Sequence, residues 1–345
     1  MGPVPAVHLT ARDQLTVVLT LKDRVPFTLR WMHYMDDARC PFPIVIADGG
    51  TDGAAAERLR RPEHYPHLRF EYLRYPVDRD YAAYCRKLAD AVERVPTPYV
   101  LLADNDDFFL LEPVGSFLEL LDTQPEVVSC GGQAVHLQLL STDGHRAATP
   151  VAAAYSAVVD TRDKSITDPR PVERMCEFMT TTSRGLWSSW YHVHRTTALQ
   201  AALRMVRAHT FSDPLTFEIH VHLTLLATGQ YRQLAVPFWV RQRGTSQLSA
   251  DLDAVGTLFE RFTRNNSLED LRRSVSSSSL SSEDRQRVDH AISEWWAGQA
   301  PRHQTVLDRV GRRFTRWLAR AARPAASVRA PVRLPTLEKY ILDRP

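Results

Sequence analysis

The sequence predicts an α/β protein in which a mostly parallel sheet is flanked by helices and followed by a helical C-terminal extension. Three observations predict this class. Strand-like apolar runs alternate with helical patterns over the first hundred residues, two of those runs end in acidic turns, and the last hundred residues have helical spacing with many arginines. The chain of 345 residues is long enough for one large α/β domain with an appendage, or for two domains.

The first half of the chain alternates strand and helix signals. Buried strands are predicted from apolar or alternating runs, and the helices between them from amphipathic spacing. The predicted strands are 15–21, 43–53, 68–75 and 99–104, and the predicted helices are 24–35, 54–60 and 81–94. This alternation favours a parallel sheet, in which ligands bind beyond the carboxyl ends of the strands. Asp48 and Asp104 both stand at such ends.

From about residue 127 the alternation is looser and predicts a mixed region. Strands are predicted over 127–140, 153–160 and 190–196, a helix over 214–228 and an extended run over 231–243. The serine-rich stretch 275–285 is predicted to be a loop that ends in a helix N-cap at Ser281 or Ser282, because acidic residues follow in the first turn.

The bulk composition is that of a soluble globular protein, with 44% hydrophobic residues, 24% charged residues and a net charge of +3. So small a net charge gives no reason to expect nucleic-acid binding. The four cysteines form no CxxC pair, which argues against a zinc or thioredoxin-type site and fits a reducing compartment. There is no signal-peptide pattern and no apolar run of about 18 residues, so we expect a cytoplasmic protein.

An acidic run, LLADNDDFFL over 101–110, follows the fourth predicted strand. Carboxylates repel one another, and burial beside apolar side chains penalises each of them. A divalent cation removes that repulsion, and Mg²⁺ and Mn²⁺ prefer carboxylate oxygens as ligands. Asp104 and Asp106 are therefore candidate metal ligands, and the alternative is a solvated acidic turn that begins the next helix.

Four segments resemble, in the same order, motifs of inverting family 2 glycosyltransferases of the GT-A fold, particularly a bacterial subgroup with a DxD-type acidic run. Residues 17–24 resemble the first strand and its turn, with Lys22-Asp23 in place of the usual residues, and 45–53 resemble the V-D-D-G-S-x-D turn. Residues 101–108, with Asp104-Asn105-Asp106, resemble the DxD strand end. Residues 216–237 resemble the helix that begins with acids and ends at a glycine, eleven positions after Glu218.

The resemblance covers about residues 14–245. It implies a GT-A-like, Rossmann-type domain with a nucleotide-binding half (about 14–125) and an acceptor half (about 126–245), followed by a mainly helical extension (246–345). It also implies a metal-dependent, inverting transfer of a sugar from a nucleotide-diphosphate donor to a hydroxyl acceptor on a glycan, a lipid-linked molecule or a small molecule.

The resemblance assigns roles residue by residue. Asp106 would bind Mn²⁺ or Mg²⁺, with Asp104 beside it, and Asp48 would contact the nucleotide. Glu218 stands where the family has its catalytic base, although Phe217 replaces the usual preceding acid, and Asp213 is the alternative base. Further candidates for binding the nucleotide-sugar are Thr20, Asp23, Arg24, Lys87, Asn105, Arg241 and Arg243.

Two side-chain groups have open interpretations. His222, one helical turn after Glu218, is either a further metal ligand or a buried core histidine. Trp187 and Trp190 form either a platform for a sugar ring or part of the core.

Two other functions remain as alternatives. A non-catalytic nucleotide-sugar-binding protein of the same fold would keep nucleotide affinity but not depend on Glu218. A sugar nucleotidyltransferase is less favoured, because residues 19–27 lack the glycine-rich loop of that chemistry.

The segment 303–324 combines a Trp/Phe/Leu stripe with six arginines at helical spacing. Such a helix can lie at the inner face of a membrane, contact a second subunit, or pack on the catalytic domain.

Overall fold

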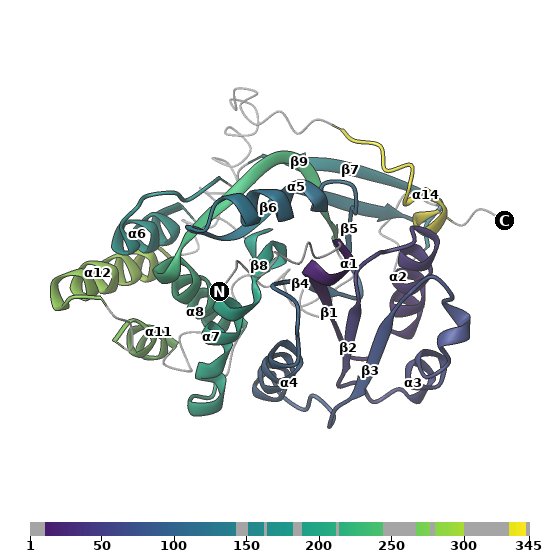
Figure 1. Ribbon diagram of the computed structural model, residues 1–345, viewed down its shortest axis with the longest axis horizontal. Coiled ribbons are helices and arrows are strands. Elements are labelled where there is room, and N and C mark those ends of the chain that lie inside the picture. Colours follow the sequence, from purple (N-terminus) through teal and green to yellow (C-terminus); the bar gives the residue numbers. More distant parts are fainter. Residues whose placement is uncertain are drawn as a thin grey trace, which may run out of the picture.

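The computed structural model describes residues 11–142, 151–161, 164–181, 188–211, 214–243, 267–276, 280–299 and 331–342. In these residues the strands form one sheet in the order β3-β2-β1-β4-β8-β6-β9-β5, with β7 paired to β6 (Figure 1). The first half of the sheet is parallel and contains β1 (Leu15–Leu21), β2 (Ile44–Asp48), β3 (Phe70–Arg74) and β4 (Tyr99–Asp104).

Helices cover both faces of the sheet. One face packs against α2 (Val25–Asp37), α3 (Gly53–Leu59) and α5 (Val114–Thr123), and the other against α4 (Tyr81–Glu93), α7 (Thr196–Ala208) and α8 (Pro214–Thr228). Every residue of β1 is buried, because its side chains alternate between the two faces: Leu19 joins the core with Trp31 of α2, and Val18 joins the core with Leu88 of α4.

The second half of the sheet is mixed. β8 (Val193–Arg195) runs antiparallel to β4, and β6 (Val127–Leu140) runs antiparallel to β8 and parallel to β9 (Gln230–Arg243). β7 (Ala154–Asp160) completes the edge beside β6, and the short β5 (Phe108–Phe109) pairs with β9, with Phe108 opposite Val240. This pairing brings residues 239–242 beside the acidic run that precedes β5.

The C-terminal extension shares both cores instead of standing apart. α11 (Ser267–Ser276) and α12 (Ser282–Gln299) pack against α8 and α6 (Pro171–Thr181), and Leu271 and Ile292 are buried there (Figure 1). As the sequence predicted, Ser281 caps α12, and its hydroxyl accepts a hydrogen bond from the Asp284 amide at 3.1 Å. Residues 331–342, which include α14 (Glu338–Ile341), lie against α2 and β7.

Most predicted elements are confirmed to within a few residues, including β1, β4, α4, α8 and β9. The sequence analysis missed α5, α6, α7 and β5, and the described structure adds the short α1 (Ala11–Gln14) and η1 (Pro62–His64). The strand predicted over 190–196 was too long, because residues 188–191 form a 3₁₀ turn (η2, Ser188–Tyr191) before β8. The segment 303–324 lies outside the described residues.

Helices long and apolar enough to span a bilayer are absent from the described part of the chain.

Candidate functional site

The acidic run lies at the topological switch point of the parallel sheet. From β1 the chain moves to β2 and β3 on one side and then returns to β4 on the other, and Thr20 of β1 stands opposite Asp104 of β4. In open α/β sheets, ligands bind at the carboxyl ends of the strands at such a point. The structure therefore places Thr20 and Asp104, two predicted site residues, at the expected edge.

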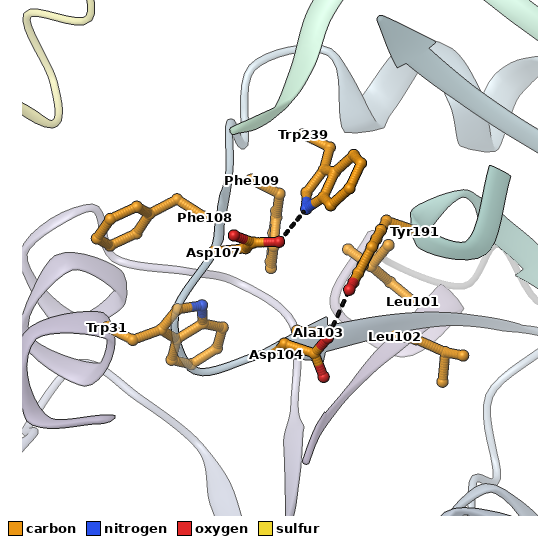
Figure 2. A pocket seen from close by; sticks show the side chains of 10 residues that line it. All are labelled: Trp31, Leu101, Leu102, Ala103, Asp104, Asp107, Phe108, Phe109, Tyr191 and Trp239. Atoms are coloured by element: carbon orange, nitrogen blue, oxygen red, sulfur yellow. Dashed lines mark hydrogen bonds between the residues drawn. The ribbon is translucent and has the colours of Figure 1, made fainter. Parts of the chain in front are cut away.

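Asp104 is held by two hydroxyl groups. The Thr20 hydroxyl donates to its Oδ1 at 2.8 Å, and the Tyr191 hydroxyl donates to its Oδ2 at 2.5 Å (Figure 2). The Tyr191 ring stacks on Trp239 with centroids 4.1 Å apart, so β9 supports this contact from behind. Burial, together with the Asp104 charge, raises the pKa of Tyr191 well above its ordinary value. Tyr191 is therefore a neutral donor that fixes the orientation of the carboxylate.

Asp106 and Asp107 point to different partners. Asp106 Oδ2 accepts a hydrogen bond from Arg24 Nη1 at 2.7 Å, whereas Asp107 accepts from the Trp239 indole at 3.1 Å and from the Gln242 amide at 2.9 Å. Burial raises the pKa of both carboxyls, and the neighbouring acid raises it further in each case. Asp107 thus joins the acidic run to β9, and Asp106 is left as the carboxylate paired with a side-chain cation.

Asn105 serves the turn after β1. Its side-chain amide donates to the Thr28 hydroxyl at 2.9 Å and to the Asp23 carbonyl at 3.3 Å. The Asp23 carboxylate in turn accepts from the amides of Thr51 at 2.5 Å and Asp52 at 2.9 Å. Asn105 and Asp23, both predicted to bind the nucleotide-sugar, therefore tie the turns after β1, β2 and β4 together at one edge of the sheet.

Asp48 is also engaged within the protein. It is 1% exposed, and it accepts hydrogen bonds from the Gly50 amide at 2.7 Å, the Tyr72 hydroxyl at 2.6 Å and Arg74 Nη1 at 2.5 Å. Through these contacts Asp48 organises the glycine turn that follows β2. A Cβ on Gly50 would stand 2.6 Å from the Asp23 amide nitrogen, so the turn needs glycine at this position.

Lys87 lies in the interior, where the sequence analysis had expected a contact to the nucleotide. It is 3% exposed, donates to the Leu21 carbonyl at 2.8 Å and pairs with Asp78. Burial lowers the pKa of Lys87 and raises that of Asp78. Lys87 thus holds the end of β1 through the Leu21 carbonyl, and Asp78 packs against Gly49 after β2, where a Cβ would clash with its carboxylate.

Glu218 is half-buried in the first turns of α8. Its charge contributes to raising the pKa of Tyr84, which burial and Asp104 raise more strongly, and the Tyr84 hydroxyl is hydrogen-bonded to Thr20. The ring of the preceding residue, Phe217, lies 5.8 Å from Trp190. The charges of Asp104 and of the predicted base therefore both act on Tyr84. The alternative base, Asp213, lies outside the described residues, as does Trp187.

Two of the predicted nucleotide-binding residues, Arg241 and Arg243, are on β9. The Arg241 guanidinium lies over the Trp239 ring at 5.3 Å, and its charge lowers the pKa of both Asp106 and Asp107. Arg241 is thus beside the acidic run. Only the backbone of Arg243 is described.

His222 has the surroundings of a core residue. It is fully buried, its Nδ1 lies 3.0 Å from the Tyr231 hydroxyl, and the rings of Phe178 and Trp190 lie 5.1 and 6.2 Å away. Burial lowers the pKa of His222 well below its ordinary value. Trp190 is likewise 6% exposed, so both residues match the core interpretation given as the alternative in the sequence analysis.

The oxygen donors of this edge are compatible with a divalent cation. Among the residues that the structure describes, no three His, Cys, Asp or Glu side chains are grouped closely enough to hold a metal ion by themselves. Mg²⁺ and Mn²⁺ are commonly held by one or two carboxylates plus the phosphates of a nucleotide, so Asp104 and Asp106 provide a sufficient protein share. The Arg24 pair occupies one oxygen of that set.

Beneath Tyr191 and Trp239 lies a cavity of about 10 Å³, room for about one water molecule, which is walled by Trp31, Phe109 and Asp107 (Figure 2). It is far too small for a nucleotide. We therefore place the candidate donor site at the strand ends above this cavity.

Three supporting residues were missed by the sequence analysis: Tyr84, Tyr191 and Trp239. Tyr84 lies four residues after the Asp80 N-cap of α4, and Tyr191 lies within the strand predicted over 190–196, directly before β8. Aromatic residues at the start of a helix or beside a strand indicate packing as readily as function. Only the pairing of β8 with β4 and of β9 with β5 brings Tyr191 and Trp239 to the acidic run.

No protein-family model and no curated protein matches the sequence. Solved structures do match. Residues 1–349 of TarS from S. aureus align with a TM-score of 0.52 and 9% identity over 86% of this chain and 77% of that chain. The same fragment in complex with UDP-GlcNAc aligns with a TM-score of 0.52 and 10% identity, over 82% and 72%.

A mannosyltransferase from Pyrobaculum calidifontis, PcManGT in complex with GDP-Man and Mn²⁺, aligns with 14% identity over 90% of this chain and 81% of that chain, but its TM-score of 0.48 is too low to support an inference. At such identities the likeness to TarS concerns the fold alone. The chain has a GT-A-like α/β fold, with a mostly parallel sheet, flanking helices and a helical C-terminal region.

Proposed function

We propose that this protein is a glycosyltransferase that moves a sugar from a nucleotide-diphosphate donor to a hydroxyl acceptor. One observation carries the proposal: Asp104 and Asp106 stand at the carboxyl end of β4, opposite Thr20 and beside Arg24 and Arg241, at the ligand-binding edge of a GT-A-like sheet. The TarS fragment, which has this fold, binds UDP-GlcNAc, which supports a nucleotide-sugar donor.

The residues of this edge suit an inverting, metal-dependent transfer. Asp106, with Asp104 beside it, would hold Mn²⁺ or Mg²⁺, and the ion would stabilise the charge of the departing diphosphate. Arg24 and Arg241 can donate paired hydrogen bonds to phosphate oxygens. Glu218 would take the proton of the acceptor hydroxyl, which then attacks the anomeric carbon from the side opposite to the diphosphate.

The domain division follows from these roles. The half of about 14–125 contains Asp104, Asp106 and Arg24, and we assign donor binding to it. Glu218 lies in the half of about 126–245, to which we assign the acceptor: a glycan, a lipid-linked molecule or a small molecule.

The test combines nucleotide binding with two substitutions. Thermal-shift titrations with UDP, GDP and dTDP, each with and without Mn²⁺, identify the nucleotide, and release of nucleotide from the matching sugar donor gives a rate. Glu218→Gln keeps the side-chain shape but cannot accept a proton, so binding should hold while turnover falls about a hundredfold or more. Asp106→Ala should abolish Mn²⁺-dependent nucleotide binding while the fold survives. Glu71→Gln, at an exposed position of β3, is the matched control.

Each part of the proposal can fail separately. Turnover that is indifferent to a chelator would contradict the metal. Loss of turnover in Asp213→Asn but not in Glu218→Gln would make Asp213 the base. Nucleotide binding without turnover in wild type, unchanged by Glu218→Gln, would favour the non-catalytic binding protein.

A further inference from the structure

Arg24 is held in place by an uncommon backbone conformation. Both Asp23 and Arg24 have left-handed φ angles, 58° and 59°, which residues with a Cβ adopt at an energetic cost. The Asp23 carboxylate fixes this turn, because it accepts hydrogen bonds from the amides of Thr51 and Asp52. Strained backbone that the surrounding structure holds in place is typical of functional sites, and here it aims one side chain at the acidic run.

The Arg24 side chain lies in a slot between an aromatic ring and a carboxylate. Its guanidinium carbon is 4.2 Å from the centre of the Phe27 ring, and its Nη1 is 2.7 Å from Asp106 Oδ2. The two charged side chains are 16% and 11% exposed, so the pair is largely shielded from water. Removing one partner from so shielded a pair leaves the other charge uncompensated and poorly solvated.

The acidic run is already balanced by cations in the described part of the chain. The charges of Arg24 and Arg241 lower the pKa of Asp106 against the effects of burial and Asp104. Arg30, buried behind them over the Phe108 ring at 4.8 Å, has a pKa lowered to about 9 by burial, which the charge of Asp106 partly opposes. The three described arginines match Asp104, Asp106 and Asp107 in number. A divalent cation that arrived alone would meet little net negative charge.

We propose that Arg24 is the resident counter-ion of Asp106, and that a nucleotide diphosphate and a divalent cation bind together by exchange with it. The Arg24 guanidinium would then donate paired hydrogen bonds to the diphosphate, and the Asp106 oxygen that it leaves would bind the cation. The inference rests on the proposed function, since it concerns the same donor site. The consequence is a strong positive coupling between the binding of cation and nucleotide. Either ligand alone would break the Arg24–Asp106 ion pair and leave one of its charges unpaired, whereas the two ligands together pair both charges.

The test measures Mn²⁺ binding directly, from the loss of the electron paramagnetic resonance signal of free Mn²⁺, with and without saturating UDP. Wild type should bind Mn²⁺ at least tenfold more tightly with UDP than without it. Arg24→Gln, which removes the charge, should bind Mn²⁺ without UDP at least tenfold more tightly than wild type, and should lose most of the coupling. Arg24→Met provides a second neutral variant, whose stem can still pack on Phe27. Arg204→Gln, at an exposed position of α7, is the matched control.

Two outcomes overturn the proposal. One is that Mn²⁺ affinity without UDP is the same, within twofold, in wild type and in the folded neutral variants. The other is that wild type binds Mn²⁺ equally well with and without UDP while UDP itself binds. If no UDP, GDP or dTDP binds to wild type, the proposed function fails, but the comparison of nucleotide-free Mn²⁺ affinities still decides the role of Arg24.

Discussion

Four buried histidines should make the stability of this protein strongly dependent on pH. Burial lowers the pKa of His192 to about 3 and those of His194 and His220 to about 4, and it lowers that of His222 well below its ordinary value. An unfolded chain binds a proton to each histidine below about pH 6.5, whereas the folded chain does not. The unfolded state therefore binds more protons between about pH 6.5 and 4, and the free energy of unfolding falls as the pH falls.

His220 is the best position for the test. Its Nε2 lies 3.2 Å from the Ala202 carbonyl, its ring packs 5.1 Å from that of Phe211, and His209 lowers its pKa a little further. With an unfolded pKa of about 6.5 and a folded pKa of about 4, His220 alone should reduce the free energy of unfolding by about 2 kcal/mol between pH 7.5 and pH 5.0. Glutamine can place an amide nitrogen near Nε2 and keep the hydrogen bond without titrating.

Urea unfolding at the two pH values, followed by tryptophan fluorescence, provides the measurement. His220→Gln should lose about 2 kcal/mol less than wild type between pH 7.5 and 5.0. The exposed His290→Gln on α12 should lose as much as wild type. The comparison of variants is needed because Asp78, Asp106 and Asp107 have raised pKa values and shift stability in the opposite direction. An equal loss in His220→Gln and wild type would refute the burial argument.

Two other predictions concern the interior and the tail. Lys87→Met should reduce the free energy of unfolding by about 3 to 5 kcal/mol, because Asp78 stays buried without its cation. Adding Asp78→Asn should recover most of that loss. A loss below about 1 kcal/mol for Lys87→Met in urea unfolding would contradict the importance of the buried pair. If 303–324 lies at a membrane, the full chain should sediment with vesicles containing anionic lipid, more weakly at high salt, and replacing Arg309, Arg312, Arg313 and Arg316 by glutamine should release it. If the full chain and this variant sediment with the vesicles to the same extent, the membrane hypothesis for 303–324 is wrong. Substitution is preferable to truncation after residue 300, since residues 331–342 belong to the core.

The parallel half of the fold could be predicted because its signals are local. β1 and β4 are continuous apolar runs that end at charged residues, and each is buried on both faces, so composition alone marks their limits. α8 was predicted as a helix but not as a buried one: it is apolar on nearly every side, and His220 and His222 are enclosed with it. The sequence left His222 open as a metal ligand or a core histidine, and its position on a buried helix makes it a core residue.

The site could be predicted only in part, because its most important contacts are between distant segments. The acidic run itself was evident, and so was its place at a strand end. The partners of the acidic run could not be seen in the sequence, because they are far away along the chain. Arg24 is 82 residues from Asp106, Tyr191 is 87 residues from Asp104, and Trp239 is 132 residues from Asp107. These contacts depend on the order and direction of strands in the sheet, which periodicity does not specify. Lys87 shows the same limit, since its sequence surroundings resemble those of a solvated helical lysine.

The attachment of residues 331–342 to α2 has a consequence for synthesis on the ribosome. Lys339 and Tyr340 contact Asp37, about 300 residues earlier in the chain, and the Tyr340 carbonyl lies 3.4 Å from Nη1 of Arg30. At a translation rate of about 5 to 20 residues per second, these partners emerge about 15 to 60 s apart. During that interval the side of α2 that carries Arg30 and Tyr34 has no cover from residues 331–342. Nascent chains stalled in this window should therefore expose an aromatic surface that the finished protein hides, and a chaperone would meet it there.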